Sequence, residues 1–214
     1  MVSLTASPDR RNHEEGELLL EERSVNESGL LVASPQMADA FFARTVVLLC
    51  DYNDEGALGL IINRITNLGS EEVLEQIEVP TAGGIAGPVH WGGPVQPGSV
   101  FLTYARQPEA LLADEQEALD LPVFQLSGGL WVSPSRKVIE AVANDADNPG
   151  AFLSLGYAGW DAGQLDSEIR SGSWIFLDNF EDVLFKLKPD EIYDYCIASL
   201  GVTEEQIWMQ PIDE

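Results

Sequence analysis

The chain has 214 residues, of which 45% are hydrophobic, enough to build the core of one domain and to exclude disorder of the whole chain. Its 36 acidic and 11 basic residues give a formal net charge of −25, and such a surface repels the phosphate backbone of nucleic acids. The charge therefore disfavours direct DNA binding and predicts a strongly solvated surface. Adaptation to a saline habitat is a more specific alternative explanation of the acidity.

The apolar runs are too short to cross a membrane. The longest, such as Val46–Cys50 and Leu58–Ile62, have the length of strands, whereas a membrane helix needs about 20 apolar residues. Met1–Asn12 contain Ser, Pro, Asp and Arg where a signal peptide carries an apolar stretch. The two cysteines, Cys50 and Cys196, both lie in apolar patterns. We therefore expect a cytoplasmic protein without membrane contact, with two buried thiols and no disulfide.

Residues 1–28 are expected to form an acidic, flexible extension ahead of one domain that spans residues 29–214. The extension carries several glutamates around the apolar patch Leu18–Leu20 and has no turn chemistry that would fix a fold. From Gly29 onward the pattern becomes globular. Thr45–Cys50 is rich in β-branched residues and predicts a buried strand.

The first half of the domain predicts a hairpin and then a short helix. The turn-forming residues Asp51–Gly56 separate Thr45–Cys50 from a returning strand over Ala57–Asn63. Ser70 is expected to begin a helix, because two glutamates follow it where the helix dipole favours negative charge. Pro80 is expected to end that helix.

The second half alternates strands and helices after a glycine-rich stretch. The glycine-rich stretch Gly83–Gly98 is expected to lead to a strand over Val100–Tyr104 and a helix within Pro108–Asp120. A hairpin of Val123–Leu126 and Leu130–Val132 around Ser127–Gly129 follows, and then a helix that begins at Ser133–Pro134. The last expected elements are a strand over Ala151–Tyr157, a helix over Asp161–Ser171, a strand over Ser173–Leu177 and a closing helix over Pro189–Leu200. Hairpins mixed with isolated helices predict a single-domain α+β fold.

The segment around Trp160 supports two interpretations. If Asp161 is the N-cap of a helix, Gln164 can accept a hydrogen bond from the Asp161 amide, and Trp160 and Leu165 form a hydrophobic staple. This structural interpretation explains much of the pattern. The functional alternative is a site in which Trp160, Gln164 and Glu168 surround a cleft, and the sequence leaves both open.

Metal and cofactor signals are weak. Asp51–Gly56 begins like a calcium loop, but the twelfth position, which needs a bidentate Glu, is Ile62. The glycines of residues 83–94 resemble an anion cradle, yet the run lacks the Lys of a phosphate loop and no helical pattern follows it, so a structural turn is favoured. We expect no metal and no cofactor.

Nucleophilic catalysis has little support in the sequence. The only histidines are His13, within the extension, and His90, so a triad or a histidine metal site would depend on His90 alone. Cys50 is a candidate redox-sensitive thiol if it is exposed near Arg44, although inert packing is the favoured interpretation.

Four blocks in order resemble the YqgE/AlgH family of uncharacterised bacterial proteins. They are Leu30–Pro35 followed by Phe42–Val47, then Gly56–Arg64, Gly92–Val95, and Gly156–Ile169 with Trp174. The resemblance implies an α+β fold whose branched, barrel-like, mostly antiparallel sheet is flanked by helices. It also implies a link to transcriptional control, because one member is associated with the regulation of exopolysaccharide synthesis, without a demonstrated DNA contact or catalytic step.

The chain departs from the family pattern at three places. The family usually carries Glu-His where this chain has Asp51-Tyr52, and often Leu-His near Leu102–Tyr104. The usual Asn-Lys/Arg-Pro tripeptide survives as Asn63-Arg64-Ile65. A reaction that relies on those imidazoles could not proceed in the same way here.

We therefore expect a non-enzymatic regulatory or adaptor protein, a monomer or small homo-oligomer, that binds an unknown protein or small ligand. The expected contact surface comprises Arg44, Asn63, Arg64, Gly92, Gly93, Pro94, Trp160, Gln164 and Glu168. One alternative is a hydrolase-like enzyme whose cleft is formed by Asn63, Arg64, Gln164 and Glu168. The other is a DNA-binding transcriptional regulator, which the charge disfavours.

Overall fold

The computed structural model describes residues 28–108, 111, 121–178 and 183–201. The expected acidic extension, apart from its last residue, lies outside these ranges, as does most of the helix expected within Pro108–Asp120. Within them the chain forms ten strands, four α-helices and a 3-10 turn: β1 (Leu30–Ala33), β2 (Val46–Asn53), β3 (Gly56–Ile61), β4 (Ile65–Gly69), α1 (Ser70–Gln76), β5 (Pro88–Trp91), β6 (Val95–Tyr104), β7 (Phe124–Gln125), η3 (Ser127–Gly129), β8 (Trp131–Ser133), α2 (Arg136–Ala143), β9 (Ala151–Asp161), α3 (Gln164–Arg170), β10 (Trp174–Leu177) and α4 (Pro189–Ser199).

One branched sheet organises the fold. Its main path runs β10-β1-β2-β3-β9-β6-β8-β7, and β5 and β4 form a branch from β9. Every strand pair is antiparallel except β5 with β9. The sheet does not close on itself, since the path ends at β10 and at β7. The α+β class and the branched, mostly antiparallel sheet are confirmed.

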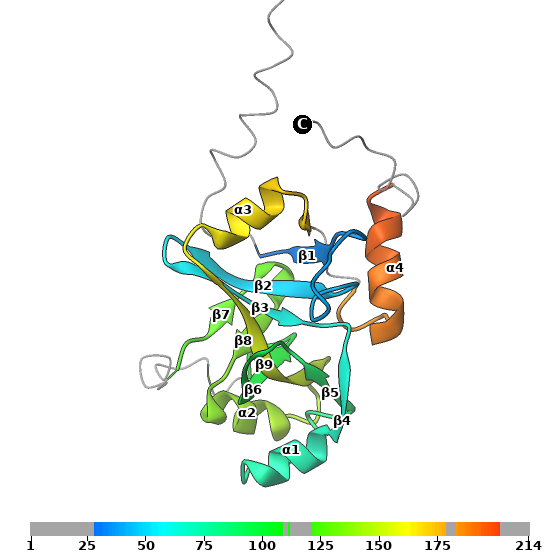
Figure 1. The fold of residues 1–214 in the computed structure, drawn as a ribbon. Helices are drawn as coiled ribbons and strands as arrows, with labels where there is room; N and C mark the ends of the chain where they lie inside the picture. Colours follow the sequence, from blue (N-terminus) through cyan, green and yellow to red (C-terminus); the bar gives the residue numbers. More distant parts are fainter. Residues whose placement is uncertain (1–27, 109–110, 112–120, 179–182, 202–214) are drawn as a thin grey trace, which may run out of the picture.

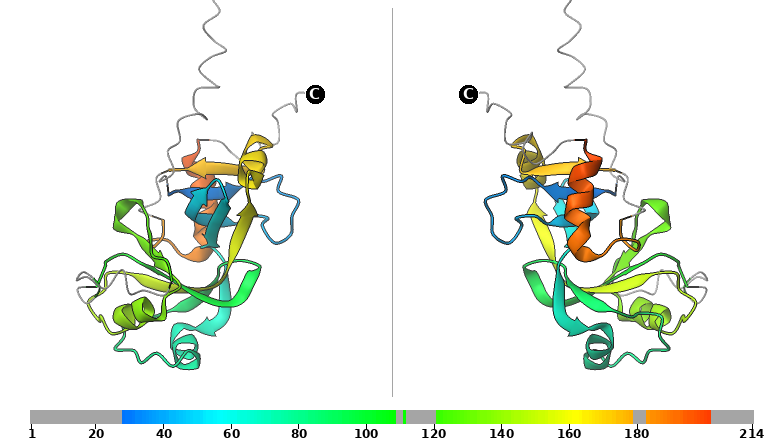
Figure 2. Two further views of the ribbon diagram at one scale, coloured as in Figure 1. Left: turned by 90° about the vertical axis from the view of Figure 1, so that its left-hand side faces the viewer. Right: turned by 90° about the vertical axis from the view of Figure 1, so that its right-hand side faces the viewer.

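Helices cover the sheet in two places and create two apolar cores. The upper core lies between β1, β2, β3 and α4 (Figure 2), and includes Leu48, Ile61 and Cys196. The lower core lies between the β6–β9 region and helices α1 and α2, and includes Leu102 and Ile139. None of the helices in the described ranges is long and apolar enough to span a membrane.

Strand β9 lies at the branch point, and three glycines let the backbones approach there. Its last residues pair with β3, whereas its earlier residues lie between β5 and β6. A Cβ on Gly92 would lie 2.2 Å from the carbonyl oxygen of Gly156, and a Cβ on Gly93 would lie 2.3 Å from that of Tyr157. Gly156 itself has φ +69. Gly92 and Gly93 therefore shape the backbone at the branch.

One segment expected to be a turn is largely strand. β2 continues to Asn53, because Asp51 and Tyr52 pair with β3 after a register shift at Cys50, and only two residues are left for the turn. Strand pairing outweighed local turn propensity there. The glycine-rich stretch Gly83–Gly98 contains β5 and the start of β6, but its runs favoured as structural turns lie mostly outside the strands, at residues 83–87 and 92–94.

The predicted starts of α2 and α3 were also wrong, each by two residues. Asp161 pairs with Gly56 as the last residue of β9, so the N-cap of α3 is Gly163 with φ 71, not Asp161. Ser133 belongs to β8, and Ser135 is the N-cap of α2. Helix α1 ends at Gln76, before Pro80. Strand β4 was not expected at all.

The branch point generates a stability prediction. Gly156→Ala places a methyl group 2.4 Å from the carbonyl oxygen of Gly93 at a positive φ, so it should lower the free energy of unfolding by about 2–4 kcal/mol. Gly98→Ala is the matched control, because a Cβ there meets nothing within 4 Å, and its effect should stay within about 0.5 kcal/mol. Urea unfolding of both variants measures the difference. Equal stabilities of the two variants would contradict the role of Gly156 at the branch point.

Candidate functional site

The corner segment, residues 39–45, connects β1 to β2 and is fastened by Asn63. The Asn63 Nδ2 donates to the carbonyl oxygen of Arg44 at 2.8 Å, and its Oδ1 accepts from the amide of Val46 at 2.8 Å. Arg44 has φ 57, a conformation that costs free energy for a residue other than glycine. Asn63 therefore holds a strained backbone turn in place.

Arg64 fastens the same segment from the next position. Its Nη1 donates to the carbonyl oxygen of Phe41 at 2.8 Å and its Nη2 to that of Ala43 at 2.9 Å. The guanidinium also lies over the Trp91 ring, 5.6 Å from its centroid. The planar fork of Arg64 thus binds two carbonyls and an aromatic face at once.

Phe41 is held in an exposed position by these contacts. Its side chain is 60% exposed, although its amide donates to Asp39 Oδ1 at 2.7 Å and its carbonyl accepts from Arg64. Its ring lies 6.4 Å from that of Trp91, between centroids. Large aromatic side chains are seldom both exposed and ordered. We call Phe41, Arg64 and Trp91 the Phe41 patch.

Arg44 connects the corner segment to helix α4. Its Nη2 forms an ion pair with Asp194 at 2.5 Å, and its guanidinium lies 4.4 Å from the centroid of the Tyr193 ring. Both charged side chains are largely exposed, so the ion pair contributes little stability by itself. Its effect is to orient the corner segment relative to α4.

A second network is centred on the Glu168 carboxylate. Its Oε2 accepts from Trp160 Nε1 at 2.9 Å and from Trp174 Nε1 at 2.8 Å, and its Oε1 accepts from Gln164 Nε2 at 2.8 Å. The Gln164 Oε1 accepts the amide of Asp161 at 3.0 Å, as the capping interpretation predicted. The carboxylate therefore ties α3 to β9 and β10.

The structure places the polar side chains of the expected surface in these two networks, whereas Gly92 and Gly93 lie at the branch point. Asn63 and Arg64 lie between β3 and β4, whereas Trp160 pairs with Ala57, the second residue of β3. Phe42 lies between the networks, its ring centroid 6.5 Å from that of Trp160 and 5.6 Å from that of Trp174. The four polar residues of the hydrolase-like alternative thus form two separate sets of contacts.

A further contact joins β2 to α3. The Tyr52 hydroxyl donates a short hydrogen bond to Asp166 Oδ1. This bond, with a smaller contribution from burial, raises the pKa of Tyr52 to about 12. Tyr52 stands where the family resemblance implies a histidine, and here this position makes a hydrogen bond from a neutral hydroxyl to a carboxylate.

Cys50 and His90 are both packed in the interior. Cys50 is buried, its Sγ donates to the carbonyl oxygen of Leu48 at 3.4 Å, and burial raises the pKa of the thiol. This environment favours inert packing over redox sensitivity. His90 Nδ1 lies 2.8 Å from the Ile62 carbonyl oxygen, its ring lies against Phe152, and burial lowers its pKa. No cluster of metal-ligating side chains occurs in the part of the chain that the structure describes.

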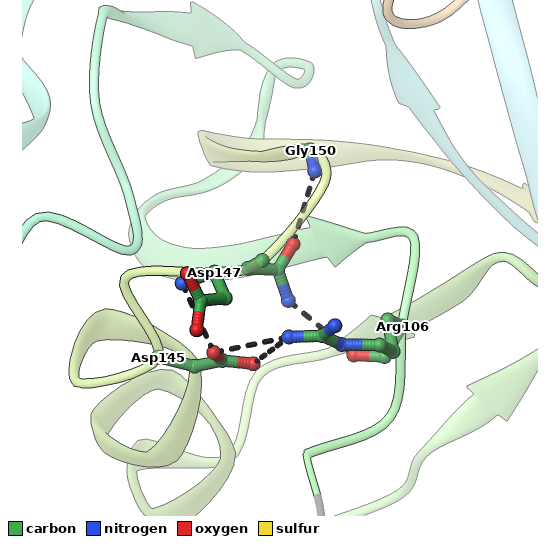
Figure 3. Close-up of polar contacts among 5 residues, drawn as sticks. Arg106, Asp145, Asp147 and Gly150 are labelled. Atoms are coloured by element: carbon green, nitrogen blue, oxygen red, sulfur yellow. Dashed lines mark hydrogen bonds and ion pairs between the residues drawn. The ribbon is translucent and has the colours of Figure 1, made fainter.

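Figure 3 shows a polar network at the other end of the molecule. The Arg106 Nη2 lies 2.8 and 3.1 Å from the two Asp145 oxygens, and the Asn148 side-chain Nδ2 donates to the Arg106 carbonyl at 3.4 Å. The backbone amide of Asp147 donates to Asp145 Oδ1 at 3.2 Å, and that of Gly150 donates to Asn148 Oδ1 at 3.1 Å. These contacts close the connection between α2 and β9 and leave the acidic side chain of Asp145 paired.

Sequence reasoning missed the aromatic side chains that surround the two networks. Phe41 and Trp91 were not singled out from the sequence, and Trp174 was named only as part of a family block. The available signal was the pair of neighbouring aromatic residues Phe41-Phe42 before a predicted strand. Here Phe42 packs toward Trp160 and Phe41 faces solvent.

Comparison with known proteins places this arrangement in a family. Residues 30–205 match the model of the DUF179 family, described as AlgH-like. The chain belongs to the AlgH-like family. A UPF0301 protein of Paracoccus denitrificans is 34% identical over 184 residues, covering 85% of this chain and 93% of the relative. One from Paraburkholderia phymatum is also 34% identical, covering 83% and 89%.

Solved structures agree with the AlgH-like fold. The solution structure of AlgH from Pseudomonas aeruginosa superposes with a TM-score of 0.66 at 34% identity, covering 90% of this chain and 97% of that one. A crystal structure of a Corynebacterium diphtheriae protein gives a TM-score of 0.61 at 19% identity, with 88% of each chain covered. The second likeness shows the fold alone.

The Tyr52 contact predicts a pH dependence. The pKa of Tyr52 rises from an ordinary value of 10.0 to about 12 on folding, so its contribution to stability is complete below pH 10 and is lost as the pH rises toward 12. Tyr52→Phe should therefore be less stable than the wild type at pH 8. The difference between the two should shrink between about pH 10 and 12. Denaturant unfolding at each pH measures it, and a constant difference would contradict the assignment.

Proposed function

We propose that this AlgH-like protein is a non-enzymatic regulatory or adaptor protein of the cytoplasm, and that it binds a partner protein through the Phe41 patch. The observation that carries the proposal is the exposed Phe41 ring, held in one place by backbone bonds to Asp39 and Arg64 and by contact with Trp91. A side chain that is ordered before binding loses little conformational entropy on binding.

The composition of the patch suits a protein partner. Aromatic side chains and Arg are the residues most enriched among those that dominate binding energy at protein interfaces. Phe41 and Trp91 supply apolar area, and Arg64 lies over the Trp91 ring while its donors hold the backbone. The bond from Arg64 to the Phe41 carbonyl holds the backbone of Phe41, and the contact with Trp91 restricts its ring.

The polar side chains proposed for a hydrolase-like cleft are engaged in holding the fold. Asn63 and Arg64 bind the carbonyls of the corner segment, and Gln164 and Glu168 bind each other and the indoles. These contacts support a role in shape rather than in proton transfer, which needs a group directed at a substrate.

The charge supports a protein partner over nucleic acid. A net charge of −25 opposes direct contact with phosphates and favours encounter with basic proteins. Any role in transcriptional control would then act through a bound protein. Self-repulsion at this charge is consistent with a monomer or a small homo-oligomer.

Affinity capture from cell extract tests the proposal. Immobilised wild type and Tyr195→Ala should retain the same protein, whereas Phe41→Ala should lose most of it, about tenfold or more, because removal of a central aromatic anchor typically costs at least 1.4 kcal/mol. Tyr195 is a matched control, since it is an exposed aromatic on α4. Mass spectrometry identifies the retained protein. Equal retention by Phe41→Ala would refute the patch.

A further inference from the structure

Strand β4 lies at the edge of the sheet's branch, next to the Phe41 patch. Among the described residues it pairs only with β5, and in Figure 1 it runs along the side of the molecule with β5 on its inner side. Ile65, Asn67 and Gly69 are exposed, with Ile65 at 54%. No charged residue or Pro occurs within β4, although edge strands usually carry them as protection against pairing.

The pattern of hydrogen bonds directs three backbone groups away from β5. The Trp91 amide donates to the Arg64 carbonyl at 2.9 Å, so Ile65 and His90 form a non-hydrogen-bonded pair, and the amide and carbonyl of Ile65 point outward. The Ser70 amide donates to the Gly87 carbonyl at 3.0 Å, which gives the Gly69 amide the same outward direction. The Gly69 carbonyl is not available, because Gly69 is the N-cap of α1 and its carbonyl accepts the first bond of that helix.

The surroundings of this edge are acidic. Helix α1 follows β4 directly, and its exposed glutamates, together with the one just after it, are Glu71, Glu72, Glu75 and Glu78. Arg64 precedes β4, but its guanidinium is directed to the corner segment and Trp91. A chain segment that pairs with β4 would therefore meet negative charge at the Gly69 end.

We infer that the β4 edge binds a short, extended, basic peptide segment of a partner protein as an added strand. This rests on the proposed function and specifies the partner's chemistry. Backbone bonds to Ile65 and Gly69 supply affinity, and basic side chains facing α1 supply specificity. The register shift between Ile65 and Gly69 interrupts the ladder, so the edge accommodates a short segment rather than a long strand.

A second copy of this chain is a less favourable occupant than a basic peptide. Pairing two β4 edges would bring two molecules of net charge −25 together, with the α1 glutamates of each close to the shared edge. Light scattering of the full chain at physiological salt reports this case directly. A dimer that Ile65→Pro dissociates would overturn the inference.

Two synthetic peptides of seven residues test the edge. One alternates Lys with Val and the other alternates Glu with Val, so they share apolar content and differ in charge. The full chain at about 0.15 M salt should bind the Lys-Val peptide and slow hydrogen exchange at the Ile65 and Gly69 amides by about tenfold. It should not bind the Glu-Val peptide. Binding without protection of the Ile65 amide would overturn the inference.

Ile65→Pro and Ile65→Thr separate the backbone contribution from charge attraction. Proline removes only an outward amide, because the bonds to β5 come from neighbouring residues, and proline is tolerated at such edge positions. Ile65→Pro should weaken the affinity for the Lys-Val peptide about fivefold to tenfold, since the hydrogen bond from the Ile65 amide and its cross-strand geometry are lost. Ile65→Thr retains the amide, so its affinity for the Lys-Val peptide should stay within about twofold of the wild-type affinity. Equal affinity for wild type and Ile65→Pro would show charge attraction alone and refute the edge.

Failure of this inference is distinguishable from failure of the proposed function. If Phe41→Ala loses the cellular partner while Ile65→Pro keeps it, the partner binds the Phe41 patch alone and the edge inference is wrong. If Ile65→Pro loses the partner while Phe41→Ala keeps it, the proposed role of the patch is wrong. Loss with both variants, each still folded by circular dichroism, supports both.

Discussion

The structure depends on a short set of hydrogen bonds from side chains to backbone carbonyls. Asn63 and Arg64, between β3 and β4, bind the carbonyls of Phe41, Ala43 and Arg44. These bonds hold the corner segment against the sheet, support a strained Arg44 and present Phe41 to solvent. Without them the corner segment would keep its contacts through Phe42 and Arg44, but the backbone of Phe41 would lose its bond to Arg64.

The recognisable polar and glycine positions serve the same purpose elsewhere. Glu168 gathers three N–H donors and so joins α3 to two strands, while Gly92 and Gly156 let three strands cross at close range. A buried or half-buried donor must find an acceptor, so each of these contacts specifies one arrangement of the backbone. The residues of the hydrolase-like alternative therefore make contacts that hold the backbone.

The sequence predicted the parts of the fold that local patterns control. The apolar runs of β2 and β3, the long α4 helix and the α+β class followed from periodicity and turn residues, and the resemblance supplied the branched sheet. β4, β5 and the true start of α3 were not predictable, because each depends on pairing with a strand distant in sequence. The expected surface remains a prediction, and which of its residues contact each other depends on the long-range register of β3 with β9, which spacing does not encode.

The central claim is that Arg64 fixes the corner segment. Hydrogen exchange of Arg64→Lys tests it most directly, because lysine keeps the charge but cannot bind two carbonyls and stack on Trp91 together. The account predicts that the amides of Ala43 and Thr45 exchange about fivefold to tenfold faster in the variant, while those of β2 and β3 are unchanged. Unchanged protection of Ala43 and Thr45 would contradict it.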